Sequence, residues 1–250
     1  SIIVCSATNI EHIDSTYCDK KNIKIISLKN QTQFLSSITG TPELAWGLLL
    51  AAHRKIIACS LDVIDGEWRR DLFKGTQLSE KILGIVGLGR IGTQISKYAA
   101  AFNMNSYYFD PHVLKSSKNK NSPKKLNSLI DLFVKSDFIF LSLTSNSLTR
   151  NIINKELLSL TKKNVSIINV ARGEVIDEEF ICEMVLNQKI NFYATDVLKG
   201  EKDYSFKSSS LWKLRKNPRV LITPHIGGAC IDSMNYTEEF CQEMVIKALL

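Results

Sequence analysis

The sequence predicts an α/β protein built on a doubly wound parallel sheet, and two observations lead to this prediction. From about residue 82 onward, short apolar runs rich in β-branched and aromatic residues alternate with stretches that have the apolar spacing of helices. Runs that are apolar at nearly every position are typical of parallel strands buried on both faces. Right-handed crossovers between such strands place helices on both sides of the sheet.

The predicted strands and helices alternate regularly along this part of the chain. The predicted strands are 82–86, 106–109, 138–143, 165–170, 191–195 and 220–223. The predicted helices are 91–102, 126–135, 155–160, 178–187 and 209–214. Strands that alternate with helices in this way indicate repeated β-α-β units within a single sheet.

A further helix is predicted just before this unit. Threonine is a favoured helix cap, proline suits the first helical turn and glutamate suits the positive helix end, so Thr41-Pro42-Glu43 predicts a helix start. This helix is expected to continue to about Lys55. A last helix is predicted from about Ile231 to the end of the chain.

Residues 1–40 contain the pieces of another α/β unit. We expect a strand at 2–7 that is buried, a short helix at 14–20 and a strand at 23–27. Forty residues are too few to bury a core of their own, so we expect upstream residues to be missing. The alternative is a small flap on the larger domain. We therefore expect a partial domain at 1–40, a main domain at 41–229 and a helix at 230–250 that returns to the first.

Composition argues against a membrane protein. The chain has 250 residues, 44% of them hydrophobic and 23% charged, which is ordinary for globular proteins. The longest apolar stretch, residues 44–52, is bounded by charged residues and is too short to cross a bilayer. Residues 1–5 have no basic segment of the kind that opens a signal peptide. We expect a cytoplasmic protein that does not associate with membranes.

The cysteines point to the same compartment. None of them forms a Cys-x-x-Cys pair or clusters with histidine at metal-ligand spacing, so we expect no metal site. Reduced, buried thiols are the expected state in a chain of this size without a secretory signal. The cysteines are Cys5, Cys18, Cys59, Cys182, Cys230 and Cys241.

A net charge of +7 requires that nucleic-acid binding be considered. Much of the excess lies in one Ser/Asn/Lys-rich stretch without interleaved aromatic residues, which favours a solvated loop over a binding face. We therefore expect no nucleic-acid partner. The lysines of this stretch are Lys115, Lys118, Lys120, Lys124 and Lys125.

A glycine-rich turn follows the first strand of the main domain directly. Residues Gly87, Gly89 and Gly92 form the pattern G-x-G-x-x-G, which opens the next helix at Arg90 and Ile91. The first glycine permits a tight turn, the second lets a pyrophosphate approach the backbone, and the third allows close packing of helix and strand. Free N–H groups at the helix start favour phosphate. The context predicts a Rossmann dinucleotide-binding site.

An aspartate lies where such a site needs an acid. Asp110 stands eighteen residues after Gly92, at the end of the next predicted strand. A carboxylate there binds the adenosine ribose hydroxyls and repels a 2′-phosphate, so NAD is the expected cofactor. A helix cap or turn residue is the alternative role for Asp110, and the nearby Lys115 leaves NADP open.

Five motifs together resemble the D-isomer-specific 2-hydroxyacid dehydrogenases, the family of phosphoglycerate, glycerate and D-lactate dehydrogenases. They occur in the family's order and span nearly the whole chain. The motifs are Thr41-Pro42-Glu43-Leu44-Ala45-Trp46, Leu83-Gly84-Ile85-Val86-Gly87-Leu88-Gly89-Arg90-Ile91-Gly92, Asn169-Val170-Ala171-Arg172-Gly173, Asp196-Val197 with Glu201, and Thr223-Pro224-His225-Ile226-Gly227-Gly228.

The resemblance implies an oxidoreductase that transfers hydride between NAD and a small 2-hydroxy or 2-keto acid. By that resemblance Arg172 binds the substrate carboxylate and keto oxygen, His225 is the general acid and base, and Glu201 hydrogen-bonds His225. Arginine offers a two-pronged donor that matches a carboxylate, and histidine has a pKa near working pH. Each alternative is structural: a surface-paired Arg172, a solvated Glu201 and a structural His225.

The same resemblance implies further cofactor contacts. Arg172, Glu201 and His225 follow predicted strands, at the edge of a parallel sheet where ligands bind. Asp196 resembles the family residue near the nicotinamide amide, with a structural cap as the alternative. Val170 and Gly227 are expected to line the same pocket.

The chain also departs from the family pattern. Ala7 and Asn9 stand where the family has a glycine-rich turn near the substrate carboxylate, and Lys202 replaces the proline that follows the catalytic glutamate.

The resemblance further implies a flavodoxin-like substrate domain, of which residues 1–40 are part. It also implies a homodimer, because the helix from Thr41 resembles the family's dimer helix; ordinary burial within the chain is the alternative for the apolar residues of this helix.

Other functions remain open at this point. Formate dehydrogenases share the fold but normally carry glutamine where Glu201 stands. An NAD-sensing binding protein, such as a transcriptional corepressor of the same family, can retain the catalytic residues. A remnant that binds the cofactor without turnover is the third alternative.

Overall fold

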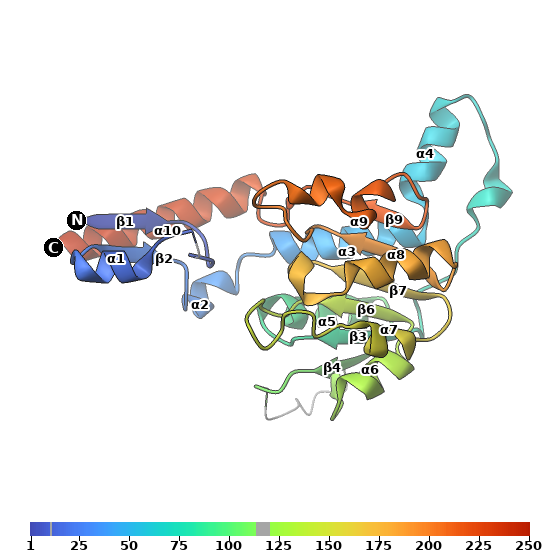
Figure 1. Ribbon diagram of the computed structural model, residues 1–250, viewed down its shortest axis with the longest axis horizontal. Helices are drawn as coiled ribbons and strands as arrows, with labels where there is room; N and C mark the ends of the chain where they lie inside the picture. The colour runs from blue at the N-terminus through green and yellow to red at the C-terminus, as the bar shows by residue number, and fades with distance from the viewer. Residues whose placement is uncertain (11, 114–120) are drawn as a thin grey trace. The chain divides into compact units, whose positions relative to one another are not determined.

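The computed structural model describes residues 1–10, 12–113 and 121–250. The chain divides into two compact units, drawn in Figure 1. The larger unit is Thr41–Gly227, and the smaller consists of Ser1–Gly40 together with Gly228–Leu250.

The larger unit contains a seven-stranded parallel sheet with the order β5-β4-β3-β6-β7-β8-β9. All six predicted strands are confirmed, and each end lies within two residues of the prediction. The strands are β3 (Ile82–Val86), β4 (Asn105–Phe109), β5 (Lys124–Lys125), β6 (Phe138–Leu141), β7 (Val165–Asn169), β8 (Ile190–Thr195) and β9 (Val220–Ile222).

The helices of this unit also follow the predicted alternation from α5 onward. Each of these begins and ends within a few residues of its prediction, whereas α4 and the short 3-10 turns were not predicted. The helices are α3 (Gly40–His53), α4 (Ile56–Ile64), α5 (Arg90–Ala101), α6 (Leu129–Lys135), α7 (Lys155–Ser159), α8 (Glu178–Leu186) and α9 (Ser210–Lys213). The 3-10 turns are η1 (Arg70–Phe73), η2 (Gly173–Val175) and η3 (Ser205–Ser208).

Each central strand buries side chains on both of its faces. Phe138 and Phe140 of β6 join the apolar cluster formed with α3 and α5, whereas Ile139 and Leu141 join the cluster formed with α6, α7 and α8. Successive residues of a strand point to opposite faces, so one apolar run serves two layers of helices. Figure 1 shows the sheet between these layers. The predicted doubly wound parallel fold is therefore confirmed.

The predicted cap of α3 is wrong. The helix begins at Gly40, so Thr41 lies inside it, and the Thr41 hydroxyl donates to the carbonyl oxygen of Gly227 at 2.9 Å. The Thr41 hydroxyl therefore bonds a residue distant in sequence instead of capping the helix as the sequence pattern predicted. The helix also ends at His53, short of the predicted Lys55, because Lys55 adopts a left-handed φ of 53° before α4 begins.

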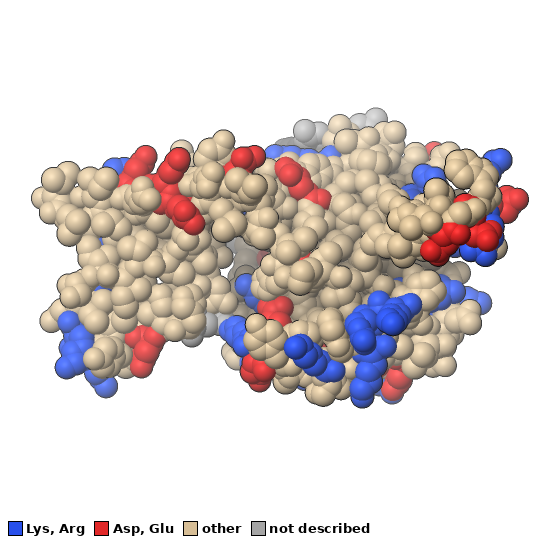
Figure 2. Space-filling view, turned by 90° about the horizontal axis from the view of Figure 1, so that it is seen from above, with Lys and Arg blue, Asp and Glu red and all other residues tan. Residues whose placement is uncertain are grey.

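The solvated loop predicted around residues 115–125 is partly wrong. Lys124 and Lys125 form β5, which pairs in parallel with β4 at the edge of the sheet. The Lys125 ammonium donates to the Val113 carbonyl at 2.6 Å. Lys115, Lys118 and Lys120 lie outside the described residues. On the side of the larger unit seen in Figure 2, Lys and Arg side chains are mixed with Asp and Glu side chains.

The smaller unit has a two-stranded parallel sheet formed by β1 (Ile2–Cys5) and β2 (Lys24–Ser27). Helix α1 (Ser15–Lys20) connects the strands, α2 (Thr32–Leu35) follows them, and α10 (Ile231–Leu249) packs against both strands. The elements predicted here are present. The expectation that the first strand is buried is wrong, since Val4 is 48% exposed and its strand neighbours are half-buried.

A small apolar core joins the two ends of the chain within this unit. Leu28, Leu35 and Cys241 are buried together, and the ring of Phe34 stacks on that of Phe240 with centroids 3.9 Å apart. These contacts pack α10 against the amino-terminal segment, so the C-terminal helix is part of the smaller unit.

The cysteines are unpaired, and their burial only partly matches the expectation. Cys18, Cys182 and Cys241 are buried, whereas the other cysteines are half-buried, because they lie at element ends or on an exposed helix. Among the described residues, no helix is both long and apolar enough to span a membrane. No group of three or more His, Cys, Asp or Glu side chains in that part of the chain is arranged to hold a metal ion.

Candidate active site

The glycine-rich turn lies where the strand order of the sheet reverses. The chain runs outward from β3 through β4 to β5, then returns to β6 on the other side of β3. Ligands bind in open parallel sheets at this switch point, beyond the carboxyl ends of the strands. The turn follows β3 there, and the Ser142 hydroxyl after β6 donates to the Gly87 carbonyl at 2.8 Å.

The glycines of the turn serve different geometric needs. Gly87 has a φ of +89°, which residues with a Cβ rarely adopt. A Cβ on Gly92 would overlap the carbonyl oxygen of Gly87, so helix and turn approach each other too closely for any side chain. A Cβ on Gly89 would meet no atom within 4 Å, so the backbone at Gly89 faces open space. This arrangement fits a pyrophosphate laid over the turn.

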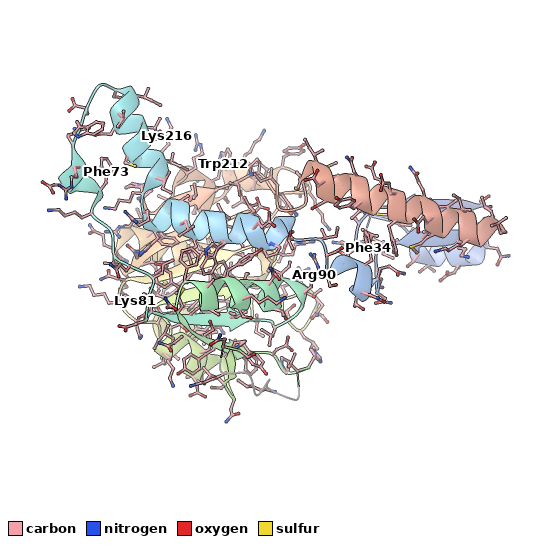
Figure 3. All side chains as sticks on the ribbon, turned by 180° about the vertical axis from the view of Figure 1, so that it is seen from behind. Phe34, Phe73, Lys81, Arg90, Trp212 and Lys216 are labelled. Carbon is pink, nitrogen blue, oxygen red and sulfur yellow. The ribbon has the colours of Figure 1, made fainter. Side chains whose placement is uncertain are left out.

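The start of α5 completes the cradle. Arg90 is the first residue of the helix, as Figure 3 shows, and burial lowers the pKa of its guanidinium. Ile91 packs against the apolar cluster beneath the helix, which fixes the helix start on the sheet. Backbone N–H groups at a helix start point toward the adjacent turn and favour an anion there.

Asp110 lies beside the turn, at the end of β4. One carboxylate oxygen accepts from the N–H of Leu88 at 2.9 Å, and the other accepts from the N–H of His112 at 2.8 Å. The carboxylate therefore braces the glycine-rich turn, in agreement with the alternative role as a turn residue. Its binding to a ribose stays a prediction.

The segment after β7 carries Arg172. Asn169, the last residue of β7, is fully buried, and its side-chain oxygen accepts from the N–H of Ala171 at 3.0 Å. Its amide group donates to the Arg172 carbonyl at 3.0 Å and to the Tyr193 hydroxyl at 3.2 Å. These bonds fix the backbone of Arg172, while the guanidinium donates to the Ala171 carbonyl. Val170 is buried at the same strand end.

The segment after β8 is organised around Asp196, which is 2% exposed. Its carboxylate accepts from the Thr223 hydroxyl at 2.6 Å, from the Ile226 N–H at 2.9 Å and from the Gly227 N–H at 2.7 Å. Gly227 is also buried. Three bonds to one carboxylate close the loop after β9, which matches the structural alternative for this residue; its place near a nicotinamide stays a prediction.

The His225 backbone is held in an unusual conformation by the same loop. His225 has a φ of 55°, in the left-handed region, and its N–H donates to the Asp196 carbonyl at 2.9 Å. Non-glycine residues with positive φ are uncommon and often occur at functional sites. The sequence did not predict this conformation, because the bond from the His225 N–H goes to Asp196, which follows a different strand.

His225 and Glu201 form a close pair. The Nδ1 of His225 lies 2.7 Å from Oε1 of Glu201, while Oε2 of Glu201 accepts from the Leu198 N–H at 3.3 Å. The hydrogen bond to Glu201 raises the pKa of His225 and outweighs burial and the repulsion of Arg172. Burial raises the pKa of Glu201, but the bond to His225 is among the contacts that bring it below its usual range.

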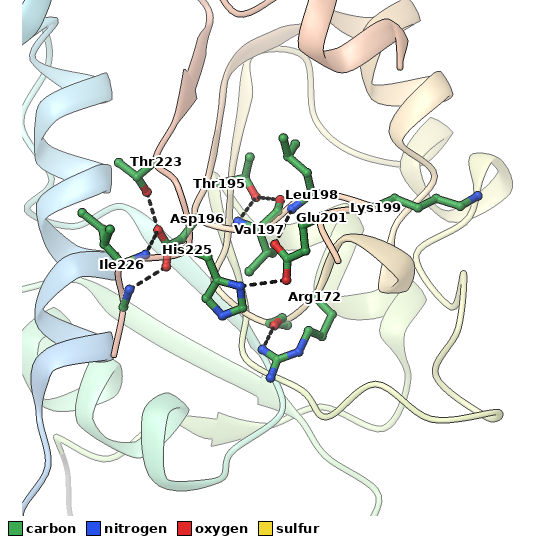
Figure 4. Close-up of polar contacts among 12 residues, drawn as sticks. Arg172, Thr195, Asp196, Val197, Leu198, Lys199, Glu201, Thr223, His225 and Ile226 are labelled. Carbon is green, nitrogen blue, oxygen red and sulfur yellow. Dashed lines mark hydrogen bonds and ion pairs between the residues drawn. The ribbon is translucent and has the colours of Figure 1, made fainter. Parts of the chain in front are cut away.

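The structure brings Arg172, Glu201 and His225 together. Figure 4 shows the three side chains beside one another at the carboxyl ends of the strands. The positive charge of Arg172 acts to lower the pKa of both other residues. An arginine beside an imidazole–carboxylate pair can bind a small anion and exchange a proton with it.

Some residues of the site were not singled out from the sequence. Thr223 and Asn169 lay inside quoted motifs, so the motif was visible but their bonding was not. Thr195, at the end of β8, accepts from Val197 N–H and donates to the Val197 carbonyl at 2.6 Å, which shapes the segment before Glu201.

Comparison with known proteins identifies the class. Residues 46–227 match the model of the D-isomer specific 2-hydroxyacid dehydrogenase NAD-binding domain. The match covers most of the chain, and its segment contains the glycine-rich turn and the loops described above. The chain belongs to the D-isomer specific 2-hydroxyacid dehydrogenase family, and its larger unit is the family's NAD-binding domain. The family and the cofactor predicted from the sequence are therefore confirmed.

Individual relatives agree with this assignment. The chain is 33% identical to a D-3-phosphoglycerate dehydrogenase of Methanocaldococcus jannaschii over 248 residues, 99% of this chain and 45% of the relative. It is 32% identical to a hydroxypyruvate reductase of Thermotoga maritima, covering 99% of this chain and 77% of the relative. The chain thus spans less than half the length of the first of these relatives.

Solved structures share the fold. A D-lactate dehydrogenase from Aquifex aeolicus, in complex with NAD and lactic acid, matches with a TM-score of 0.84 and 26% identity over 100% of this chain and 76% of that one. A D-2-hydroxyisocaproate dehydrogenase matches with a TM-score of 0.89 at 21% identity, over 99% of this chain and 76% of that one. This second likeness concerns the fold alone.

Proposed function

We propose that the protein is an NAD-dependent D-2-hydroxyacid dehydrogenase that interconverts a small 2-hydroxy acid and its 2-keto acid. The single observation that carries this proposal is the His225–Glu201 pair, 2.7 Å apart, beside Arg172 at the switch-point edge of an NAD-binding domain. A small acid fits this edge because one group can bind its carboxylate while the other exchanges a proton at the neighbouring oxygen.

The cofactor site we propose has two parts. Gly87, Gly89 and Gly92 with Arg90 and Ile91 hold the pyrophosphate, since the turn has open space at Gly89 and helix N–H groups beside it. Asp110 binds the adenosine ribose. Bound NAD supplies or accepts the hydride.

The other part lies at the ends of β7 and β9. We place Val170 and Gly227 along the wall of the nicotinamide side, and Asp196 behind them. Asp196 acts there through the loop that it holds, because its oxygens already accept from Thr223, Ile226 and Gly227.

The acid–base step we propose uses one defined nitrogen of His225. A carboxylate only accepts hydrogen bonds, so the His225 Nδ1 must donate to Glu201. This leaves Nε2 to hold the proton that is given to a keto oxygen or taken from a hydroxyl. The raised pKa of His225 favours the protonated ring before reduction. Arg172 binds the substrate carboxylate and polarises the keto oxygen.

The test follows NADH absorbance with a panel of small 2-keto acids, using the protein in its natural length. His225→Ala is expected to lower kcat by about 10²- to 10⁴-fold, the usual contribution of general acid–base catalysis, while NADH still binds. Near-normal turnover in this variant would remove His225 from the chemistry. Tight NADH binding without oxidation by any substrate would instead support an NAD-sensing binding protein or an inactive remnant.

We propose that Asp110 sets the preference for NAD over NADP, because its carboxylate lies beside the turn where a 2′-phosphate would meet it. Titration with NADH and NADPH tests this proposal. Tighter binding of NADPH would contradict the role assigned to Asp110.

We propose that the protein forms a homodimer through α4 and the segment that follows it. The helix from Thr41, which the resemblance pointed to, buries Ala45, Leu48 and Leu49 within the larger unit. In Figure 1 α4 extends away from the sheet of the larger unit. Trp68 is 84% exposed and Ile64 is 74% exposed, and contiguous apolar surfaces of this kind mark interaction sites. The other exposed apolar side chains of this surface are Ile56, Ile57, Leu61, Val63 and Leu72.

Sedimentation of Ile64→Asp tests the dimer. A charge at this position is expected to shift the protein to monomers, because an unpaired charge is costly in an apolar interface. Leu148→Asp is the matched control, since Leu148 is 85% exposed and lies away from α4 in sequence. A wild type that sediments as a monomer, or an Ile64→Asp variant that stays dimeric, would contradict the proposal.

We propose that Ser1–Gly40 with Gly228–Leu250 belongs to the substrate domain of the protein. The parallel pair of β1 and β2 with α10 against it is the observation that supports this. The cytoplasmic location stays a prediction.

A further inference from the structure

A second carboxylate, that of Glu178, is buried and bonds the segment that contains Glu201. Glu178 is the first residue of α8 and is 7% exposed. Its Oε1 accepts from the backbone N–H of Lys199 at 2.9 Å. Glu178 is not needed as the helix cap, because Asp177 already accepts from the Phe180 N–H at that helix end. The Glu178 side chain therefore serves the segment that contains Lys199.

Lys199 lies in the segment between the end of β8 and Glu201. The segment leaves β8 at Thr195, and Glu201 folds back on it to accept from the Leu198 N–H. Figure 4 shows Lys199 and Glu201 next to each other on this segment. A shift of the backbone at Lys199 therefore moves Glu201, and Glu201 is the partner that orients the His225 ring.

The segment that follows Arg172 packs directly against the same backbone. A Cβ on Gly173 would overlap the Lys199 nitrogen and the Leu198 carbonyl carbon, so no side chain fits between the two segments. The Lys199 N–H thus lies where the Arg172 segment and the Glu201 segment meet. Glu178 accepts from that N–H and so ties the two segments to helix α8.

Burying a carboxylate at this place is unfavourable for the folded protein. Burial is the main cause that raises the pKa of Glu178, to about 7, and Glu174 and Glu179 add repulsion. The bond to the Lys199 N–H and the charge of Lys199 act in the opposite direction. Burial raises the pKa of Cys182 in α8 and of Tyr193 in β8, and the charge of Glu178 in turn raises both further. An apolar residue would avoid this cost but would leave the Lys199 N–H without its acceptor.

We propose that Glu178 is a positioning residue of the active site, which holds the backbone at Lys199 so that Glu201 stays in hydrogen-bond register with His225. This inference rests on the proposed function for its catalytic consequence. The structural part of the proposal does not depend on turnover. It says that the distance between Glu201 and His225 depends on a hydrogen-bond acceptor at position 178 on a side chain as long as that of glutamate.

Two substitutions separate the reach of the side chain from its charge. Glu178→Gln keeps an oxygen at the same distance from the backbone but cannot ionise. Glu178→Asp keeps the charge but is one methylene shorter, so its oxygens fall short of the Lys199 N–H. Both changes are conservative in size, which favours folded variants, and a melting curve for each variant checks this.

The main readout is the pKa of His225, followed by NMR of the imidazole protons against pH and assigned with His225→Ala. In Glu178→Asp the pKa is expected to fall toward the ordinary histidine value, because Glu201 no longer meets Nδ1. In Glu178→Gln it is expected to stay at the wild-type value. Glu179→Gln is the matched control: Glu179 is the next residue on the same helix and is exposed, so no change is expected.

The catalytic readout follows from the same geometry. Glu178→Asp is expected to lower kcat by about 10- to 100-fold with NADH affinity unchanged, since misplacing a reacting group by about 1 Å has effects of this size. Glu178→Gln is expected to keep kcat within about twofold of wild type at pH 7, because its reach is unchanged.

Two results would overturn the proposal. One is a His225 pKa in Glu178→Asp that matches wild type. The other is a fall in Glu178→Gln as large as in Glu178→Asp, which would assign an electrostatic role to Glu178 instead of positioning. Because the NMR titration needs no substrate, a protein without turnover would refute the proposed function and leave this test intact.

Discussion

Asp196→Ala is expected to destabilise the protein strongly, because one buried carboxylate closes the loop after β9. The variant leaves the buried Gly227 N–H without an acceptor, at a cost of about 1–3 kcal/mol. The Thr223 hydroxyl and the Ile226 N–H are more accessible, so water replaces part of each bond and the cost is about 0.5–1.5 kcal/mol apiece. The expected loss is about 4 kcal/mol, a large share of the stability of a typical domain.

Urea unfolding followed by circular dichroism measures this loss, with the slope of the transition checked against wild type. The melting temperature is expected to fall by roughly 8–16 °C. Asp196→Asn keeps one acceptor oxygen, so its loss is expected to be intermediate. Asp203→Ala is the control, since this aspartate is exposed and accepts from the Ser205 N–H of its own turn. A loss in Asp196→Ala below about 1 kcal/mol would refute the bonding account.

The remaining predictions concern cofactor binding and pH. Gly92→Ala is expected to lower both the melting temperature and the NADH affinity, because a Cβ there would overlap the Gly87 carbonyl oxygen. Gly89→Ala has open space for its Cβ and is expected to lower the NADH affinity alone. Calorimetry measures both quantities, and an equal fall in melting temperature for the two variants would contradict this geometry. Glu201→Gln is expected to lower the pKa of His225 in an NMR titration and to destabilise most between the ordinary pKa values of 4.5 and 6.5, where both partners are charged. Because the pKa of Glu178 is raised in the folded protein, wild-type stability is expected to fall as pH rises from 4.5 to about 7. Glu178→Gln lacks this titration, so its stability relative to wild type is expected to increase over that range and to stay higher above it. A difference in stability that is constant from about pH 4 to 8 would contradict this prediction.

Much of the fold could be predicted from the sequence because its signals are local. The near-continuous apolar run at 82–86 and the glycines directly after it specify strand, turn and helix within a dozen residues. The family motifs likewise marked Arg172, Glu201 and His225 before any geometry was known. Each of these signals concerns residues that are close together in the chain, where backbone sterics and hydrophobic period act directly.

The errors came from residues whose partners are distant in sequence. Thr41 has the composition of a helix cap, yet its hydroxyl bonds Gly227. Lys124 and Lys125 resemble a solvated loop, but the edge of β4 offers them backbone partners. Local propensity is weak compared with a tertiary hydrogen bond, so these positions could not be predicted from their neighbours.

The identity of the residues, their order and the spacing of apolar positions were enough to specify a doubly wound domain that binds NAD. That Glu201 meets His225, and that Asp196 closes the loop which carries His225, depended on contacts between the segments after β8 and β9. Such contacts come from packing of distant segments, which the one-dimensional pattern of a chain does not encode residue by residue. Only the folded structure could therefore supply the geometry of the site.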